Sequence, residues 1–338
     1  MEYVTMRKLN RDVSRIGLGT WSIGGFMWGG TDEQAALETI LQALDHGITL
    51  LDTAPAYGLG RAEELVGRAL AQHGERQKII IATKVGLEWR GGQVFRNSSK
   101  TRIMKEIDDS LRRLQTDYVD IYQIHWPDPL VPIEETAAAI HQLHKQGKIR
   151  AIGVSNYSLE QLNLFRQAAP LHTAQPPYNL FERGVEKDVL PYCHSHGIST
   201  LTYGSLCRGL LSGKMKLNSE FRGDDVRKID PKFQQPRYAQ YLKAVERLDR
   251  FAQENFGKHV LELAMRWTLD QPFVTAALWG ARHPTQLTPV SAISGWKLDT
   301  AALIAIDEIV RDSVTDPVGP EFMAPPARSS AAAQPLSA

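Results

Sequence analysis

The sequence lacks the features that mark secreted, membrane-spanning and nucleic-acid-binding proteins. Only two of its 338 residues are cysteines, Cys193 and Cys207, so we expect no disulfide framework and reduced thiols in a cytoplasmic protein. No apolar run approaches the ~20 residues of a membrane span, and the first ten residues, MEYVTMRKLN, contain no apolar signal-peptide core. Lys and Arg number 39 against 38 Asp and Glu, a balance that argues against a basic face for nucleic acid or a membrane surface.

What the chain does contain is an alternation of strand and helix patterns with a period of roughly 30 residues. Eight strand-like runs rich in apolar and β-branched residues occupy 15–20, 48–54, 78–84, 119–125, 149–156, 172–177, 197–205 and 274–280. Helical patterns lie at 32–46, 62–72, 101–114, 133–146, 159–168 and 241–256. Thr31 is expected to cap the first helix, and Gly47 and Gly147 to follow helix ends. The alternation predicts an α/β fold, a (β/α)8 TIM barrel, rather than an open doubly wound sheet.

We expect one barrel domain over residues 1–316, with three segments outside the alternation. Residues 1–13 are predicted to form a hairpin over the barrel bottom. Residues 204–237 form a long loop after strand seven, rich in Gly, Lys and Arg, and connections of this length are usually functional. Residues 317–338 are rich in Pro, Ala and Ser, and we expect a disordered tail there.

Three familiar motifs are incomplete. The run from Gly17 to Ser22 begins like a dinucleotide fingerprint but has Ser22 at the third glycine position. The GLLSGK run at 209–214 has three residues between its glycines where a P-loop has four. The histidines at 141 and 144, and the Cys-His-x-His run at 193–196, offer no complete ligand set, so no metal site is expected.

Four residues near the ends of consecutive strand-like runs carry the functional prediction. Asp52, Tyr57, Lys84 and His125 lie in the stretches LLDTAPAYG, IIIATKVG and DIYQIHWPD. The carboxyl ends of neighbouring barrel strands lie side by side, at the end where barrel enzymes have their active sites. Each residue alone has an ordinary structural explanation, such as capping a turn. Together, an acid, a phenol, an amine and an imidazole indicate proton transfer to a carbonyl oxygen.

Tyr57 is the predicted proton donor. A free tyrosine has a pKa near 10, and we expect the ammonium of Lys84 to lower that pKa. Asp52 is expected to keep Lys84 charged, and His125 to orient the substrate oxygen or the phenol. None of the four supplies a hydride, so a carbonyl reduction at this site needs a bound nicotinamide.

These motifs, in this order and spacing, resemble the aldo-keto reductase family. They are residues 51–58 (LDTAPAYG), 82–84 (ATK), 124–127 (IHWP), 152–156 (IGVSN), 175–179 (QPPYN), Tyr203 and residues 209–214 (GLLSGK). The resemblance runs from about residue 7 to residue 310. Residues 277–282 (ALWGAR) and the run His-Trp-Pro-Asp are most similar to a bacterial branch whose members act on glycerol, glyceraldehyde and related polyols or aldehydes.

The resemblance implies NADPH or NADP+ as cofactor, with NADH as a weaker alternative. Ser155, Asn156 and Gln175 match residues that bind the nicotinamide carboxamide, and Tyr203 the residue that stacks on the ring. Gly204, Ser205, Leu206 and Gly209 match the segment over the pyrophosphate. Gly280, Ala281, Arg282 and Gln286 match the segment that holds the adenosine 2′-phosphate, with Arg282 as the natural ion-pair partner. Thr20, Trp21 and Asp52 match residues beside the cofactor.

The substrate implied is a small carbonyl compound or alcohol held by Trp21, Tyr57, His125 and Trp126; Trp28 and Trp89 also fall near the predicted active face. Pro289 and Val290 replace a Glu-Asn pair that many relatives have near the adenine, so strict NADPH preference stays open. A monomer is expected, with weak association left open. Two other functions stay open: a non-catalytic, NADPH-binding redox-sensing subunit, and another barrel enzyme, such as a metal-dependent hydrolase or a Lys84 Schiff-base aldolase.

Overall fold

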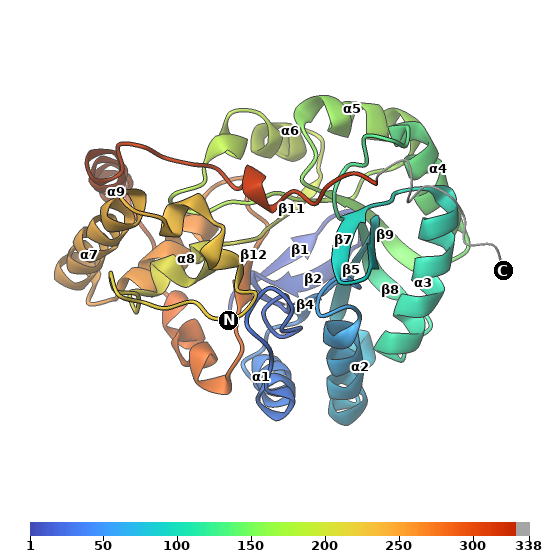
Figure 1. Cartoon of the computed structure of the whole chain (residues 1–338), viewed down its shortest axis with the longest axis horizontal. Coiled ribbons are helices and arrows are strands. Elements are labelled where there is room, and N and C mark those ends of the chain that lie inside the picture. Colours follow the sequence, from blue (N-terminus) through green and yellow to red (C-terminus); the bar gives the residue numbers. More distant parts are fainter. Residues whose placement is uncertain (329–338) are drawn as a thin grey trace.

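Eight parallel strands close into a barrel in the computed structural model, which describes residues 1–328 (Figure 1). In chain order they are β3 (Ile16–Gly19), β4 (Leu50–Asp52), β5 (Ile80–Val85), β8 (Val119–Ile124), β9 (Ile149–Ser155), β10 (Thr173–Gln175), β11 (Ser199–Thr202) and β12 (Ala276–Gly280). Each pairs with the next, and β12 pairs with β3. The predicted (β/α)8 barrel is confirmed; seven of the eight strands fall inside the predicted runs, and β5 ends one residue beyond the run 78–84.

Helices surround the barrel (Figure 1). They are α1 (Glu33–Asp45), α2 (Arg61–His73), α3 (Lys100–Leu114), α4 (Ile133–Lys145), α5 (Leu159–Ala168), α6 (Val189–Ser195), α7 (Arg237–Phe256), α8 (Val260–Asp270) and α9 (Thr300–Ser313). The 3-10 turns between them are η1 (Arg76–Lys78), η2 (Gly184–Glu186) and η6 (Pro284–Ile293). The six predicted helical patterns correspond to α1–α5 and α7. The predicted cap of α1 is wrong by one residue, because the Asp32 carboxylate, rather than Thr31, accepts from Ala35 N at 3.0 Å.

An antiparallel hairpin closes the amino-terminal end of the barrel, as predicted. It consists of β1 (Tyr3–Met6) and β2 (Arg11–Ser14). Met6 and Val13 are fully buried in one cluster with residues at the starts of the barrel strands, including Leu50, Ile80 and Ala276. Since this end is sealed by apolar packing, a ligand can enter only from the carboxyl ends of the strands. A second hairpin, β6 (Leu87–Arg90) with β7 (Gln93–Arg96), follows β5 at that open end.

The connection after β11, which we call the strap (residues 204–236), contains η3 (Cys207–Ser212), η4 (Val226–Lys228) and η5 (Pro231–Phe233). No helix within residues 1–328 is both long and apolar enough to cross a bilayer.

The disordered tail predicted from residue 317 needs correction for residues 317–328. This segment, which includes η7 (Glu321–Met323), crosses the open end of the barrel from α9 towards β7 (Figure 1). Lys232 Nζ donates to Gly319 O at 3.0 Å, Arg96 N donates to Pro326 O at 2.9 Å, and Arg328 pairs with Asp128 at 3.3 Å. Composition alone missed these contacts because their partners lie far away in the sequence. Residues 329–338 lie outside the described residues.

Helices α2 and α3 approach closely at Gly67. A Cβ built on Gly67 would stand 2.4 Å from Arg113 O and 2.9 Å from Leu114 C. The backbone of α3 therefore occupies the space that any larger residue would need.

We predict that Gly67→Ala destabilises the protein although alanine is the better helix former by about 1 kcal/mol. The clash forces the two helices apart, and overpacking of this kind costs about 1–3 kcal/mol. Urea unfolding followed by circular dichroism measures the effect. Gln72→Ala, at an exposed position of the same helix, is the control and should leave the midpoint unchanged; a midpoint for Gly67→Ala at or above wild type would contradict the packing argument.

Candidate active site

The four residues predicted from strand ends do converge at the open end of the barrel. Asp52 ends β4, Lys84 lies in β5, His125 directly follows β8, and Tyr57 lies in the turn after β4. Lys84 Nζ donates to Asp52 Oδ1 at 2.6 Å and stands 4.8 Å from the centroid of the Tyr57 ring. The rings of Tyr57 and His125 meet edge to face with centroids 5.6 Å apart. Adjacent strands therefore bring the acid, amine, phenol and imidazole into one cluster.

Asp52 is the centre of the hydrogen bonding in this cluster. Its Oδ2 accepts from Gln175 Nε2 at 2.7 Å and from Gln123 Nε2 at 3.4 Å, opposite the bond from Lys84. Lys84 also donates to Thr53 O at 3.0 Å. The sequence interpretation missed Gln123, although a signal was present. Gln123 is a fully buried polar residue of β8. It precedes His125 by two positions, so both side chains point to the same face.

Burial dominates the protonation of the site. It lowers the pKa of Lys84, while the charge of Asp52 and its hydrogen bond act in the opposite direction. Burial also holds the pKa of His125 well below its ordinary value, and the neighbouring Lys84 charge lowers it further. His125 is therefore a neutral imidazole at physiological pH.

The predicted lowering of the Tyr57 pKa is wrong for this structure. Burial raises the pKa of the phenol well above 10, and the charge of Asp52 raises it further. The reason is geometric: the Lys84 ammonium donates to Asp52 and Thr53 O rather than to the phenol oxygen of Tyr57. Tyr57 consequently carries its proton at neutral pH, which is the form a proton donor needs.

A cavity of about 300 Å³ opens beside Tyr57 and His125. Trp21, Tyr57, His125 and Trp126, the predicted substrate-binding residues, all line it. The other walls include Phe26 and Met27 from the loop after β3, Leu87 and Val94 from the β6–β7 hairpin, and residues 322–326 of the carboxyl-terminal segment. The cavity is mostly apolar, with Tyr57 and His125 among its few polar groups. Trp89 lies outside it, with the Arg102 guanidinium 5.5 Å from its ring centroid.

Residues predicted to contact a nicotinamide form one wall of the same cavity. Tyr203 donates to Asn156 Oδ1 at 2.8 Å, Asn156 Nδ2 donates to Ser155 Oγ at 3.0 Å, and Ser155 Oγ donates to Gln175 O at 2.8 Å. This chain of hydrogen bonds fixes Ser155, Asn156 and Tyr203 relative to Gln175, which itself holds Asp52.

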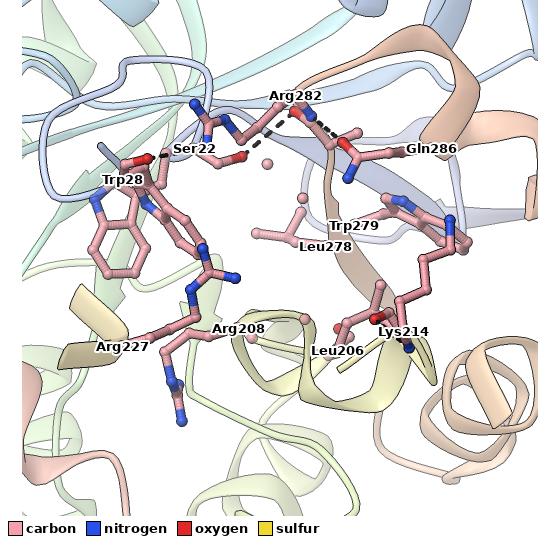
Figure 2. A pocket seen from close by; sticks show the side chains of 18 of the residues that line it. Ser22, Trp28, Leu206, Arg208, Lys214, Arg227, Leu278, Trp279, Arg282 and Gln286 are labelled. Carbon is pink, nitrogen blue, oxygen red and sulfur yellow. Dashed lines mark hydrogen bonds between the residues drawn. The ribbon is translucent and has the colours of Figure 1, made fainter. Parts of the chain in front are cut away.

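A second cavity, of about 590 Å³, continues from the first between the strap and the end of β12 (Figure 2). The two cavities share Trp21, Tyr57, Tyr203 and Met323. Predicted cofactor residues that line the larger one are Trp21, Asp52, Tyr203, Gly204, Ser205, Leu206, Gly209, Gly280, Ala281, Arg282 and Gln286. Thr20 lines neither cavity; it is fully buried, and its hydroxyl donates to Asp52 O at 3.0 Å.

The larger cavity offers donors and positive charge. Figure 2 places Arg282 and Gln286 on one side and Leu206, Arg208 and Lys214 on the other. Arg227, which the sequence interpretation missed, also lines it and lies over the rings of Phe221 (4.4 Å) and Trp28 (5.4 Å). The hydroxyl of Ser205 and Nε1 of Trp28 are buried and have no hydrogen-bond partner within residues 1–328. Such a cavity suits a ligand that carries phosphates and other acceptors.

Two of these cations are paired with acids. Arg227 donates to both carboxylate oxygens of Asp225, at 2.9 and 2.5 Å, and Arg208 belongs to a larger buried cluster. Its guanidinium is buried, donating to Asp230 and Glu182 at 2.5 Å each, and Lys232 Nζ pairs with Glu182 at 2.8 Å. This neutral cluster fastens the strap to the body of the protein. Within residues 1–328 no group of three or more His, Cys, Asp and Glu side chains is arranged to hold a metal ion.

A parallel barrel with these four residues and a long cavity beside them is the architecture of a carbonyl-reducing oxidoreductase. The chain belongs to the aldo/keto reductase family, whose model matches residues 15–311. It is 58% identical over 328 residues to the aldo-keto reductase YhdN of Bacillus subtilis, covering 97% of this chain and 99% of the relative.

Solved structures give the same result. A glycerol dehydrogenase, AKR11B4 from Gluconobacter oxydans, is 50% identical with a TM-score of 0.86, and the match covers 95% of this chain and 99% of that one. An aldo/keto reductase from Klebsiella pneumoniae in complex with NADP and acetate is 29% identical with a TM-score of 0.69, over 89% and 93% of the two chains. The family and bacterial branch indicated by the sequence motifs are thus confirmed.

We predict that Lys84→Met lowers the free energy of unfolding by about 3–5 kcal/mol, because it leaves the buried Asp52 carboxylate without its cation. The double variant Asp52→Leu/Lys84→Met should be more stable than Lys84→Met, since it removes both buried charges. Urea unfolding of wild type and both variants checks this order; a double variant less stable than the single one would show that the pair is not coupled.

We predict that His125 makes the protein less stable in mild acid. Its pKa in the folded state is depressed. Below the unfolded-state pKa of about 6.5, the histidine therefore binds a proton in the unfolded chain but not in the folded protein. Stability is therefore lost as pH falls, by up to about 1.4 kcal/mol per pH unit. Unfolding measured at pH ~7.5 and ~5.5 should show a smaller loss for His125→Asn than for wild type, while the exposed His194→Asn should behave as wild type. An equal loss in all three would contradict the assignment.

Proposed function

We propose that this protein is an NADPH-dependent reductase that interconverts small aldehydes or ketones and the corresponding alcohols. The observation that carries the proposal is the junction of the two cavities at Trp21, Tyr57 and Tyr203. A long donor-rich cavity meets a small apolar one at the tyrosine that can donate a proton.

The larger cavity fits a dinucleotide cofactor. Its volume lies within the range of known cofactor pockets. The buried Ser205 hydroxyl and the cations Lys214 and Arg282 suit a pyrophosphate and a 2′-phosphate. Ser155, Asn156 and Gln175 would hold the carboxamide of the nicotinamide, and Tyr203 its ring. The cofactor supplies the hydride that none of these side chains can provide. Arg282 and the complex of the Klebsiella relative with NADP favour NADPH, with NADH as a weaker alternative.

Tyr57 donates the proton that completes carbonyl reduction. Its raised pKa keeps the phenol protonated at neutral pH, and the alkoxide formed by hydride transfer is a far stronger base than phenolate. His125, as a neutral imidazole, can donate or accept one hydrogen bond and orient the carbonyl oxygen beside Tyr57. The Asp52–Lys84 pair holds the neighbouring positive charge in place, and the apolar walls exclude water.

The substrate proposed is a small aldehyde, ketone or polyol-derived compound such as glyceraldehyde or glycerol. A cavity of about 300 Å³ limits the size. Trp21 and Trp126 provide flat apolar faces that suit alkyl chains and the carbon faces of sugars and polyols. The glycerol dehydrogenase from Gluconobacter oxydans, half of whose residues are identical, supports a polyol or its aldehyde.

We predict that Tyr57→Phe reduces kcat by at least about 10²–10⁴ because the proton donor is lost, while NADPH affinity stays within about twofold, since the ring remains. Loss of NADPH absorbance with a panel of aldehydes measures turnover, with NADH in parallel, and cofactor fluorescence measures binding. Tight NADPH binding by wild type without turnover of any carbonyl would favour the redox-sensing alternative. Retained activity in Tyr57→Phe would refute the role of the phenol.

A further inference from the structure

The loop after β3, residues 21–30, contributes to both cavities. Trp21, Phe26 and Met27 line the smaller one, and Trp21 and Trp28 line the larger. The loop contains no helix or strand, and four of its residues have left-handed backbone: Gly25 (φ 81°), Met27 (63°), Gly29 (74°) and Gly30 (96°). A glycine-rich segment of this kind loses much conformational entropy when it is fixed. Its position must therefore be maintained by contacts with other parts of the protein.

The first half of the loop packs directly on the turn that carries Tyr57. A Cβ on Gly24 would stand 2.6 Å from the carbonyl carbon of Tyr57, and one on Gly58 would stand 2.2 Å from Gly24 O. The Trp21 ring stacks on the Tyr57 ring with centroids 6.2 Å apart. Any displacement of the loop therefore alters the surroundings of the proton donor and the wall of the substrate cavity.

The second half is held by two charged side chains from distant segments and by one backbone hydrogen bond, from Val226 N in the strap to Met27 O at 2.9 Å. Asp224, in the strap, accepts from Met27 N at 2.7 Å and from Gly29 N at 2.9 Å. Arg282, just after β12, donates to Trp28 O at 3.0 Å and to Gly30 O at 2.6 Å, and Figure 2 shows it reaching over to Trp28. Asp224 thus binds the amides of residues 27 and 29, and Arg282 binds the carbonyls of residues 28 and 30, so the two side chains alternate along this segment. Charged groups make the stronger hydrogen bonds to backbone.

We propose that Arg282 and Asp224 are positioning residues for the carbonyl substrate, acting through the loop of residues 21–30. This inference rests on the proposed function and gives Arg282 a second role. Its guanidinium has five N–H donors, and its bonds to Trp28 O and Gly30 O leave donors for a 2′-phosphate. The same side chain therefore joins the phosphate end of the larger cavity to the wall of the substrate cavity.

NADH separates the two roles because it has no 2′-phosphate. With NADH, Arg282→Gln and Asp224→Asn should each raise the KM for the aldehyde about tenfold, the loss expected for charge-assisted hydrogen bonds. The KM for NADH should stay within about twofold. Arg282→Lys should restore part of the aldehyde KM, since an ammonium can still donate to the loop carbonyls. In the double variant Arg282→Gln/Asp224→Asn, the aldehyde KM should rise by less than the product of the two single increases, because both residues hold the same loop.

Arg222→Gln is the matched control. Arg222 is an exposed cation of the same strap, paired with Glu220 at 3.3 Å, and its loss should leave the aldehyde KM unchanged with either cofactor. If Arg282→Gln weakens NADPH binding but keeps wild-type kinetics with NADH, Arg282 serves only the phosphate and the proposal is overturned. Wild-type kinetics in Asp224→Asn would overturn it equally.

A measurement without turnover distinguishes failure of this inference from failure of the proposed function. Hydrogen exchange of the Met27 and Gly29 amides, in protein without cofactor, should be faster in Asp224→Asn and Arg282→Gln than in wild type and Arg222→Gln. If wild type reduces no carbonyl but exchange accelerates in both variants, the proposed function fails and the anchoring of the loop stands. Unchanged exchange would refute the anchoring itself.

Discussion

The buried ion pair of Asp52 and Lys84 is the constraint on which the rest of the active site depends. Both side chains are almost completely inaccessible to water, and burying two charges is favourable only if geometry and further hydrogen bonds compensate for desolvation. Gln175, Gln123 and the carbonyl of Thr53 provide that compensation. They come from β4, β8 and β10 or the ends of these strands, so barrel closure and strand register are preconditions for the pair.

Burial makes the charges of Asp52 and Lys84 costly to desolvate, and it also decides the protonation of the neighbouring side chains. Lys84 is positive, so a second cation at His125 would be costly, and the imidazole stays neutral. Asp52 is negative, so a phenolate at Tyr57 would be costly, and the phenol keeps its proton. The ion pair thus favours two uncharged side chains, Tyr57 and His125, at the wall of the smaller cavity, each able to form a directed hydrogen bond. Positioning of a protonated phenol, rather than a lowered phenol pKa, is what this arrangement provides.

Much of the fold and of the catalytic cluster could be predicted from the sequence because the signals are local. Short stretches of sequence are enough to recognise the strands near Asp52 and His125. The same holds for helices, whose apolar residues recur every three or four positions. Three kinds of feature could not. Gln123 can be picked out as a polar residue of its strand, but its partner Asp52 is 71 positions away, so the hydrogen bond between them could not be predicted. Arg328 and Arg282 contact residues 200 and 254 positions away. The pKa of Tyr57 depends on where the Lys84 ammonium points, which no spacing specifies.

The two cavities are built very differently from the rigid cluster between them. Strand ends form the inner walls of both cavities, whereas much of the outer wall comes from the loop of residues 21–30, the strap, and residues 317–328, none of which contributes a strand to the barrel. Such segments are held by a few side chains rather than by a core, as the bonds from Arg208, Lys232, Asp224 and Arg282 show. Because Asp224 and Arg282 hold one loop from two sides of the larger cavity, and the same loop lines the smaller cavity, we expect a displacement of either anchor to change the walls of both cavities.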